Sequence, residues 1–325
     1  MKVRVAFGTG VVLGLWSGEL SVAPTTAHLL TYHPGRCTAN CGFCAQARGS
    51  VANPDWLSRV SWPVVELERF VEAMSRNRSR LKRICCQAMN FPGAVEAICS
   101  LVSRLRGLGL PISVCCQPLS KADLVKLAEA GVDRVCIPLD AATPQVFERV
   151  KGREAGGPYR WEDHWRSLEE AIRMLRGRVV THLIVGLGEK ESQMVETMER
   201  LQEMSVTIAL FAFTPIPGTA LESLPPPPLE TYRRMQLARY LLEKGIGRVR
   251  VEEGIIRFEG EGVLEAVRSG EPFLASGCPG CNRPFYNESP RGPLYNFPRK
   301  PTPQEVEEIE RLLLDRLALD ASHEG

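Results

Sequence analysis

The segment from His28 to Cys44 reads HLLTYH-PGR-CTANCGFC, a short β-rich run that is followed by three closely spaced cysteines. The spacing is C-x3-C-x2-C, and three thiolates at this spacing on one loop can converge on a cubane iron–sulfur cluster while one iron stays open. A structural zinc site is the alternative, but it usually takes four ligands in paired C-x2-C knuckles, and no second pair lies nearby in the sequence. The segment therefore predicts a strand that ends at a metal-binding loop.

Outward from this segment, short β-rich runs alternate with longer segments of helical period, which is the pattern of βα units on a parallel sheet. Six such units predict an α/β protein with a partial (β/α)6 barrel of the TIM type. In such barrels the chemistry lies at the loops after the strands, so the cysteine loop is expected at the C-terminal mouth. The predicted strands are 28–33, 83–89, 112–117, 134–139, 179–186 and 207–213, and the predicted helices are 64–75, 94–107, 122–130, 162–176, 192–204 and 231–243.

The alternation of strands and helices stops after the sixth unit of the predicted barrel. After the sixth unit, short strands are predicted at 249–251 and 254–258. The tetrad 302–305 combines a capping box with a proline at the first helical position, which predicts a last helix that runs to about Leu319. The chain thus divides into an N-terminal extension, the barrel and a C-terminal extension, at residues 1–27, 28–245 and 246–325.

Composition excludes several classes of protein. The chain has 325 residues with 40 basic and 38 acidic side chains, and a net charge of +2 is too balanced for a protein that mainly holds a nucleic acid. The apolar run from Val5 to Trp16 is interrupted by Gly8, Gly10 and Gly14, so we interpret it as an element of the domain rather than as a signal peptide. No stretch approaches ~18 uninterrupted apolar residues, so no membrane span is expected, and a cytoplasmic location is predicted.

A second cysteine pair lies in the C-terminal extension. Cys278 and Cys281 form a C-x2-C pair, and such a pair can be half of a zinc site, a redox pair or two ligands of a second cluster. Beside the first cysteine loop, the interpretation as ligands of a second cluster is favoured.

The first cysteine loop resembles that of the radical S-adenosylmethionine (SAM) enzymes. Their signature is C-x3-C-x2-C with an aromatic residue before the third cysteine, here Phe43, and six βα units form their partial barrel. The resemblance implies that Cys37, Cys41 and Cys44 bind a catalytic [4Fe–4S] cluster whose open iron chelates the methionine part of SAM. It also implies that an electron from the cluster splits the sulfonium, which gives a 5′-deoxyadenosyl radical that abstracts hydrogen from an unactivated carbon.

Within that superfamily the chain is similar to biotin synthase over the segments 127–133, 139–141, 184–189 and 214–219. The similarity implies that Asp140 binds the ribose of SAM, that Ile184 and Val185 pack near its adenine, and that Gly186 allows a close backbone approach. A solvated aspartate at a strand end is the alternative interpretation of Asp140. The cofactor-binding residues implied by the resemblance are Phe43, Ala88, Asp140, Ile184, Val185, Gly186 and Pro215.

The chain departs from biotin synthase where that family holds a sacrificial [2Fe–2S] cluster with cysteines on three strands. The doublets 85–86 and 115–116 supply the second and third strands, and strand alternation sends at most one side chain of each doublet into the barrel. The fifth strand has Val180 or Thr181 at the expected cysteine position, so a cluster of the biotin type is incomplete. Four other cysteines and histidines are interpreted as packing residues or as neighbours of ligands: Cys99, Cys136, His33 and His182.

The tail around Cys278 and Cys281 resembles that of the archaeal-type two-component lipoyl synthases, which are biotin-synthase relatives that act as a pair of similar proteins. The resemblance implies a second [4Fe–4S] cluster that donates sulfide to an octanoyl chain, with Cys85 and Cys115 as candidates for a further ligand. It also implies three partners. These are an octanoylated carrier (a lipoyl domain or a glycine-cleavage H-type protein), a second homologous synthase component, and an electron donor such as ferredoxin.

Two other functions stay open at this point. A different biotin-synthase-like reaction, such as a rearrangement or a methylation, needs no sacrificial cluster. A noncatalytic iron–sulfur electron carrier needs no residues directed at adenosine, so Asp140 and the segment 184–189 count against it. The function predicted from the sequence is therefore sulfur insertion by a radical SAM enzyme, as one component of a lipoyl synthase.

Overall fold

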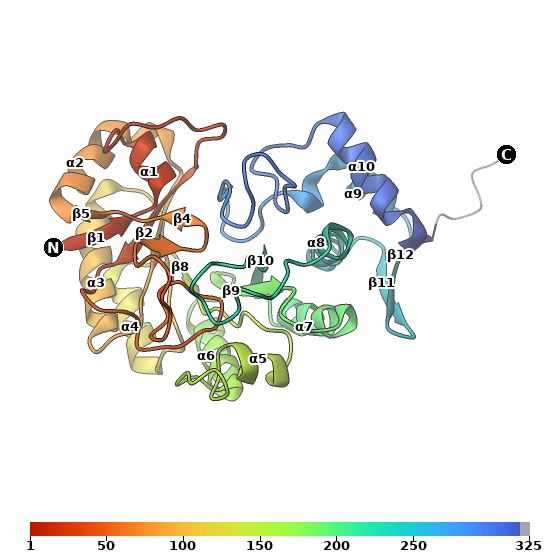
Figure 1. Cartoon of the computed structure of the whole chain (residues 1–325), viewed down its shortest axis with the longest axis horizontal. Helices are drawn as coiled ribbons and strands as arrows, with labels where there is room; N and C mark the ends of the chain where they lie inside the picture. The colour runs from red at the N-terminus through yellow and green to blue at the C-terminus, as the bar shows by residue number, and fades with distance from the viewer. Residues whose placement is uncertain (319–325) are drawn as a thin grey trace.

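The computed structural model describes residues 1–318 and has one eight-stranded sheet flanked by helices (Figure 1). Six strands are parallel neighbours in the order β10-β9-β8-β7-β6-β2, and consecutive strands are joined through helices. This arrangement confirms the predicted α/β partial barrel. The parallel strands are β2 (Thr26–Thr31), β6 (Arg83–Gln87), β7 (Ile112–Cys115), β8 (Arg134–Cys136), β9 (Val179–Val185) and β10 (Thr207–Ala212).

The helices between these strands bury one apolar face against the sheet. In α7 the buried residues Met194, Met198 and Leu201 recur at helical spacing, which forms one stripe. The hydroxyl of Ser120 accepts the N–H of Asp123 and so caps the start of α4. These helices are α2 (Leu67–Asn77), α3 (Ala94–Leu105), α4 (Lys121–Ala130), α6 (Trp161–Met174), α7 (Glu191–Glu203) and α8 (Leu229–Lys244).

The N-terminal residues are part of the sheet. Strand β1 (Lys2–Val5) pairs antiparallel with β2 on one side and with β5 (Val64–Glu66) on the other, and α1 (Phe7–Val12) follows it. Because β5 takes residues that the sequence predicts as helical, α2 begins only at Leu67. Strands β3 (Trp56–Leu57) and β4 (Val60–Ser61) form a separate small hairpin.

One helix inside the barrel is missing from the sequence-based pattern. Helix α5 (Pro144–Val150) lies between β8 and α6. Thr143 caps it by accepting the N–H of Val146, and Pro144 occupies its first turn, where a missing N–H costs no hydrogen bond. At seven residues it is too short for a clear period in the sequence, yet it leads directly to Lys151, a residue of the site described below.

The C-terminal extension forms a second, smaller layer. The last helix begins as predicted, with a capping box of Thr302 and Glu305, but it ends at Leu313. There the chain turns through a 3-10 helix into β13, which pairs parallel with β12, and the predicted end at Leu319 lies outside the described residues. The elements are β11 (Arg248–Glu252), β12 (Ile255–Glu259), α9 (Val263–Ser269), α10 (Pro303–Leu313) and β13 (Leu317–Ala318), with 3-10 helices at Arg78–Arg80, Arg106–Leu108, Glu271–Phe273 and Leu314–Arg316.

The segment between α9 and α10 bridges the two ends of the parallel sheet. Beside β10, the hydroxyl of Ser276 accepts the N–H of Leu210 at 2.8 Å. Just before β2, the amide oxygen of Asn282 accepts the N–H of Thr25 at 2.9 Å. Figure 1 draws this segment as blue loops beside β10. Within residues 1–318 there is no helix long and apolar enough to cross a membrane.

Candidate active site

The first cysteine loop follows β2 and is held by the loop that follows β6. The N–H of Thr38 donates to the carbonyl of Asn90 at 2.7 Å, and the N–H of Asn90 donates to the Sγ of Cys37 at 3.2 Å. The N–H of Cys44 donates to the carbonyl of Cys41 at 3.0 Å, which closes a tight turn. The loop thus offers three sulfurs and a backbone donor to one of them, a set that suits an iron–sulfur cluster.

Burial controls the charge of this loop. It raises the pKa of the Cys44 thiol to about 12 and also raises the pKa of Cys41, and the nearby Cys37 adds to both increases. The free thiols of Cys41 and Cys44 are therefore protonated at neutral pH. A bound metal would replace these protons and stabilise the thiolates.

Asp140 lies just beyond β8 and is 5% exposed, so the interpretation as a solvated strand end is wrong. Its backbone has φ 68°, in the left-handed region, and bridges to β9 through hydrogen bonds with His182 and Ile184. Its Oδ2 accepts from the Nζ of the fully buried Lys151 at 2.7 Å. Its Oδ1 has no partner among residues 1–318, and the side chain lines the cavity described next, so one carboxylate oxygen is free to accept from a ligand.

The barrel encloses a cavity of about 210 Å³. Phe43, Asp140 and Ile184 line it, whereas Val185 faces the opposite side of β9 and packs in the core. This position contradicts a side-chain contact between Val185 and a ligand of the cavity, because alternate residues of a strand face opposite sides. The other cofactor-binding residues implied by resemblance, Ala88, Gly186 and Pro215, lie outside the lining of this cavity.

The structure shows where each of these three residues lies and what Ala88 and Gly186 contact. The N–H of Ala88 donates to the carbonyl of Cys115. Gly186 has φ 102° and donates its N–H to the carboxylate of Glu189 at 2.7 Å, and burial raises the pKa of Glu189. Pro215 lines a neighbouring hollow. A contact with the cofactor would therefore have to come from their backbone or from the rim of the cavity.

A second group of cysteines lines the same cavity. Alternation separates each doublet, because Cys85 and Cys115 face the cavity whereas Cys86 and Cys116 pack in the core behind the sheet. The bridging C-terminal segment contributes two more cavity-lining sulfurs. The cysteines of this second group are Cys85, Cys115, Cys136, Cys278 and Cys281.

Several contacts hold the C-x2-C pair inside the barrel. The Sγ of Cys278 lies 3.3 Å from the hydroxyl of Ser113 on β7, and the Sγ of Cys281 lies 3.7 Å from the Nε2 of His28 on β2. Burial raises the pKa of Cys85 well above its usual value, and Cys278 adds to this increase more than any other neighbouring group. Residues from three strands and the C-terminal extension therefore meet in one place.

Residues 31–201, more than half of the chain, match the sequence profile of the Radical SAM superfamily. The chain belongs to the radical SAM superfamily. Among curated proteins it is similar to the biotin synthase of Halorhodospira halophila (strain DSM 244 / SL1), with 27% identity over 229 residues, which cover 68% of this chain and 67% of that enzyme.

Solved structures agree on the fold. A crystal structure of HydG, a maturase of the [FeFe]-hydrogenase, aligns with a TM-score of 0.55 at 14% identity, over 68% of this chain and 50% of the maturase. A crystal structure of methylornithine synthase (PylB) aligns with a TM-score of 0.52 at 14% identity, over 73% of this chain and 66% of the synthase. This radical SAM protein is thus of the biotin-synthase-like type, and its family implies a [4Fe–4S] cluster and SAM.

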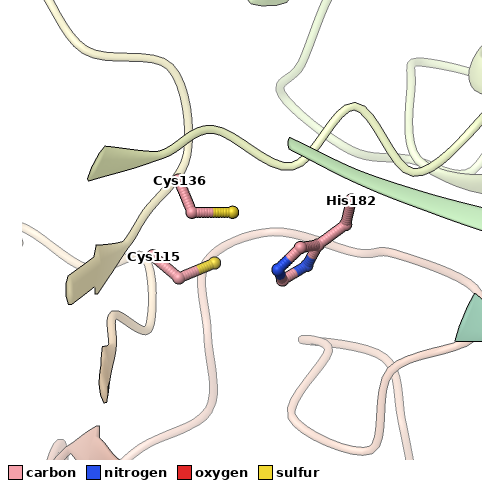
Figure 2. Close-up of side chains that lie close together, drawn as sticks. All are labelled: Cys115, Cys136 and His182. Atoms are coloured by element: carbon pink, nitrogen blue, oxygen red, sulfur yellow. The ribbon is translucent and has the colours of Figure 1, made fainter. Parts of the chain in front are cut away.

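Two residues of the radical SAM barrel need a new interpretation. Cys136 does not pack in the core like Val135 beside it, because it faces the cavity next to Cys115. His182 also lines the cavity, and Figure 2 shows both sulfurs and the His182 ring turned toward one another. Cys99 is half-buried on α3 against the core, in keeping with a packing residue, and His33 stacks on Phe91 away from this cavity.

Polar atoms without partners surround the second group of cysteines. Among residues 1–318, the Nδ1 of His28, the hydroxyl of Tyr286, and the Nε and Nη1 of Arg283 are buried and make no hydrogen bond. All three side chains line the cavity, and Arg283 stacks 4.0 Å over the ring of Phe211. Because buried polar groups are normally hydrogen-bonded, these atoms indicate that the cavity suits a polar or anionic group.

Sequence reasoning missed Lys151, His28 and Arg283 as site residues. Lys151 stands in a segment without a motif, and His28 belongs to the first predicted strand rather than to the cysteine motif that follows it. Only the folded chain brings them to Asp140 and Cys281. Cys136 did carry a signal. It alternates with Val135 and Ile137, which both face the core, so a side chain between them faces the barrel.

Proposed function

We propose that this radical SAM enzyme inserts sulfur into a protein-bound octanoyl chain, as one component of a lipoyl synthase. One observation carries the proposal. The cavity that is lined by Cys44 and Asp140 is also lined by Cys85, Cys278 and Cys281, so a radical-generating centre and a sulfur source would share one cavity.

The residues of the first centre divide the work of binding and orientation. Cys37, Cys41 and Cys44 would hold the [4Fe–4S] cluster, which together with SAM supplies a radical that abstracts hydrogen from the substrate. The free Oδ1 of Asp140 is suited to accept hydrogen bonds from a ribose diol, and Lys151 holds the other oxygen in place. Phe43 and Ile184 present apolar surface to the same cavity.

The second centre would be the sulfur donor. Cys278 and Cys281 are two thiol ligands on one short turn, and Cys85 and Cys115 are the candidates for a third. The unpartnered Nη1 of Arg283 is positioned to compensate the negative charge that thiolates and sulfide bring into a buried site. Thiol ligands together with the buried nitrogen atoms of His28 and Arg283 suit a second iron–sulfur cluster.

The walls of the cavity suit an alkyl chain. Val180, Phe211, Phe213 and Ile216 present apolar surface to the cavity, so burial of an octanoyl chain would be favourable. The partners of this proposal are an octanoylated carrier (a lipoyl domain or a glycine-cleavage H-type protein), a second homologous synthase component, and an electron donor such as ferredoxin.

The test is a sulfur-labelling experiment. The full chain is reconstituted anaerobically with iron and 34S-sulfide and is incubated with SAM, reductant, the second component and an octanoylated carrier. We expect thiolated octanoyl-lysine that carries the heavy isotope, and 5′-deoxyadenosine in proportion. The Cys278→Ala/Cys281→Ala variant should still make 5′-deoxyadenosine but no thiolated product, whereas Cys99→Ala, a matched cysteine outside the cavity, should behave as wild type.

Three results would contradict the proposal. Product with unlabelled sulfur would mean that the sulfur does not come from the protein. 5′-Deoxyadenosine formed with an octanoyl substrate that gains no sulfur would favour a different radical reaction, such as a rearrangement or a methylation. Absence of 5′-deoxyadenosine from wild type would favour an electron carrier instead.

A further inference from the structure

Cys115, Cys136 and His182 come from three neighbouring strands and meet on the inner wall of the barrel (Figure 2). Cys115 and Cys136 are direct partners in the parallel register of β7 and β8, so their side chains leave the sheet on the same side. His182 lies on β9, the next strand. The two sulfurs and a ring nitrogen all lie within 4.8 Å of one another.

We propose that Cys115, Cys136 and His182 bind a single thiophilic divalent metal ion, such as Fe²⁺ or Zn²⁺. This site goes beyond sulfur insertion, because neither the first cluster nor the C-x2-C pair uses Cys136 or His182. It also refines the proposed second cluster. With Cys115 bound to the ion, Cys85 becomes the third thiol beside Cys278 and Cys281.

The distances favour one ion over a cubane at these three residues. A tetrahedral ion with sulfur and nitrogen ligands at about 2.3 and 2.1 Å separates its ligand atoms by roughly 3.5–3.8 Å. A cubane cluster spaces the thiolates on different irons much further apart, by roughly 6 Å. The three atoms within 4.8 Å are therefore close to the arrangement of a single ion, and small side-chain rotations would complete it.

The alternatives for these side chains are less satisfactory. His182 is half-buried and lines the cavity, so its ring nitrogens are accessible to a ligand there. Its ring packs on Phe211, with centroids 4.8 Å apart, and this contact orients the ring. The nearby carboxylate of Asp140 is already paired with Lys151. Two thiols and one imidazole suit iron or zinc better than magnesium or calcium, which prefer oxygen ligands.

The surroundings leave a fourth coordination position. Val180 and Ala209 form an apolar wall against the two cysteines, and Cys278 packs against the same wall. Three protein ligands with an open position are typical of ions that take a ligand from solution or substrate. Here that position opens on the cavity, where a thiolate or sulfide would bind.

Cobalt(II) is the probe, because thiolate-bound cobalt has a visible absorption spectrum. The full chain carries Cys37→Ala, Cys41→Ala, Cys44→Ala, Cys278→Ala and Cys281→Ala, and is reduced and stripped of metal. We expect this background to bind one equivalent of Co²⁺ with a thiolate charge-transfer band. Adding Cys136→Ala or His182→Gln should weaken binding on the order of a hundredfold.

Cys116→Ala is the matched control, because Cys116 adjoins Cys115 but faces the core, and it should leave Co²⁺ affinity unchanged. Cooperative thermal unfolding checks that each variant is folded. Two results would overturn the proposal: a folded background that binds no Co²⁺, or equal binding with Cys136→Ala and His182→Gln. The proposed function fails in a different way, through a wild-type chain that holds a single cluster, and that result would leave Co²⁺ binding intact.

Discussion

The pair of Asp140 and Lys151 allows a quantitative test of how the site is held. Lys151 is fully buried, and its Nζ donates to the Oδ2 of Asp140 at 2.7 Å and to the carbonyl of Pro138. We choose Asp140→Asn because asparagine, unlike most residues, tolerates the left-handed φ of 68° at this position. The substitution removes the negative charge and keeps the shape, so it isolates the electrostatic contribution of the pair.

The expected cost follows from burial. Removing one partner of a buried ion pair costs about 3–5 kcal/mol of the free energy of unfolding, because the other charge remains without compensation. Asp140→Asn should fall at the lower end, since the amide oxygen still accepts from Lys151. Lys151→Met should cost less, because the Asp140 side chain is 8% exposed and lines the cavity, which lets water reach it. The double variant should return to within about 1–2 kcal/mol of wild type, since it buries no unpaired charge.

Denaturant unfolding of the four cluster-free, reduced chains at one pH gives this double-mutant cycle. A coupling energy of at least ~2 kcal/mol is expected. Additive single effects would show that the two charges are not coupled, and an Asp140→Asn effect below ~1 kcal/mol would show that Lys151 does not depend on the carboxylate charge. The same variant tests the free Oδ1, because loss of a charge-assisted hydrogen bond should weaken SAM binding roughly tenfold to a hundredfold with cluster content intact.

Three further predictions concern other parts of the chain. Gly186→Ala should lower the free energy of unfolding by about 1–3 kcal/mol in denaturant unfolding, because a Cβ at φ 102° would lie 2.9 Å from the Cδ of Pro227. The control Gly107→Ala has open space around the added Cβ and should not lower it. Burial raises the pKa of Glu288 to about 7, so the free energy of unfolding should fall by roughly 3 kcal/mol as pH rises from 4.5 to 7. Glu288→Gln should remove this pH dependence, and an unchanged dependence in the variant would contradict the assignment to Glu288. Asn282→Ala should lower the iron content of the second cluster and leave 5′-deoxyadenosine formation unchanged, because the side chain of Asn282 accepts hydrogen bonds from Thr25 and so fixes the turn that follows Cys281. Full iron retention would count against that role.

The features that sequence predicts here are the local ones. The C-x3-C-x2-C spacing lies within one short loop, so it can be identified without any tertiary contact. The six parallel strands occur within a few residues of their predicted bounds, because each is a short apolar run between turn residues. The start of α10 at Thr302 was equally local, since a capping box involves only four residues.

The features that sequence missed depend on tertiary contacts. Lys151 becomes a site residue only because α5 brings it under Asp140, and no motif marks that pairing. His182 and Cys136 meet through the register between β8 and β9, which single-strand patterns do not specify. The prediction for Val185 was wrong for a different reason. It followed from a motif shared with biotin synthase, although the alternation of side chains along the strand points Val185 into the core.

Sulfur insertion requires that Cys278 and Cys281 ligate a second, sulfur-donating cluster. This ligation is tested by the content of iron, acid-labile sulfide and zinc in anaerobically reconstituted wild type and in the Cys278→Ala/Cys281→Ala variant. We expect about eight cluster iron and eight sulfide per wild-type chain, besides up to about one Fe²⁺ or Zn²⁺ at Cys115, Cys136 and His182. A variant that still forms 5′-deoxyadenosine should hold about four fewer iron and four fewer sulfide. Equal iron in the two proteins, above all with zinc that disappears from the variant, would contradict the second cluster and the case for sulfur insertion.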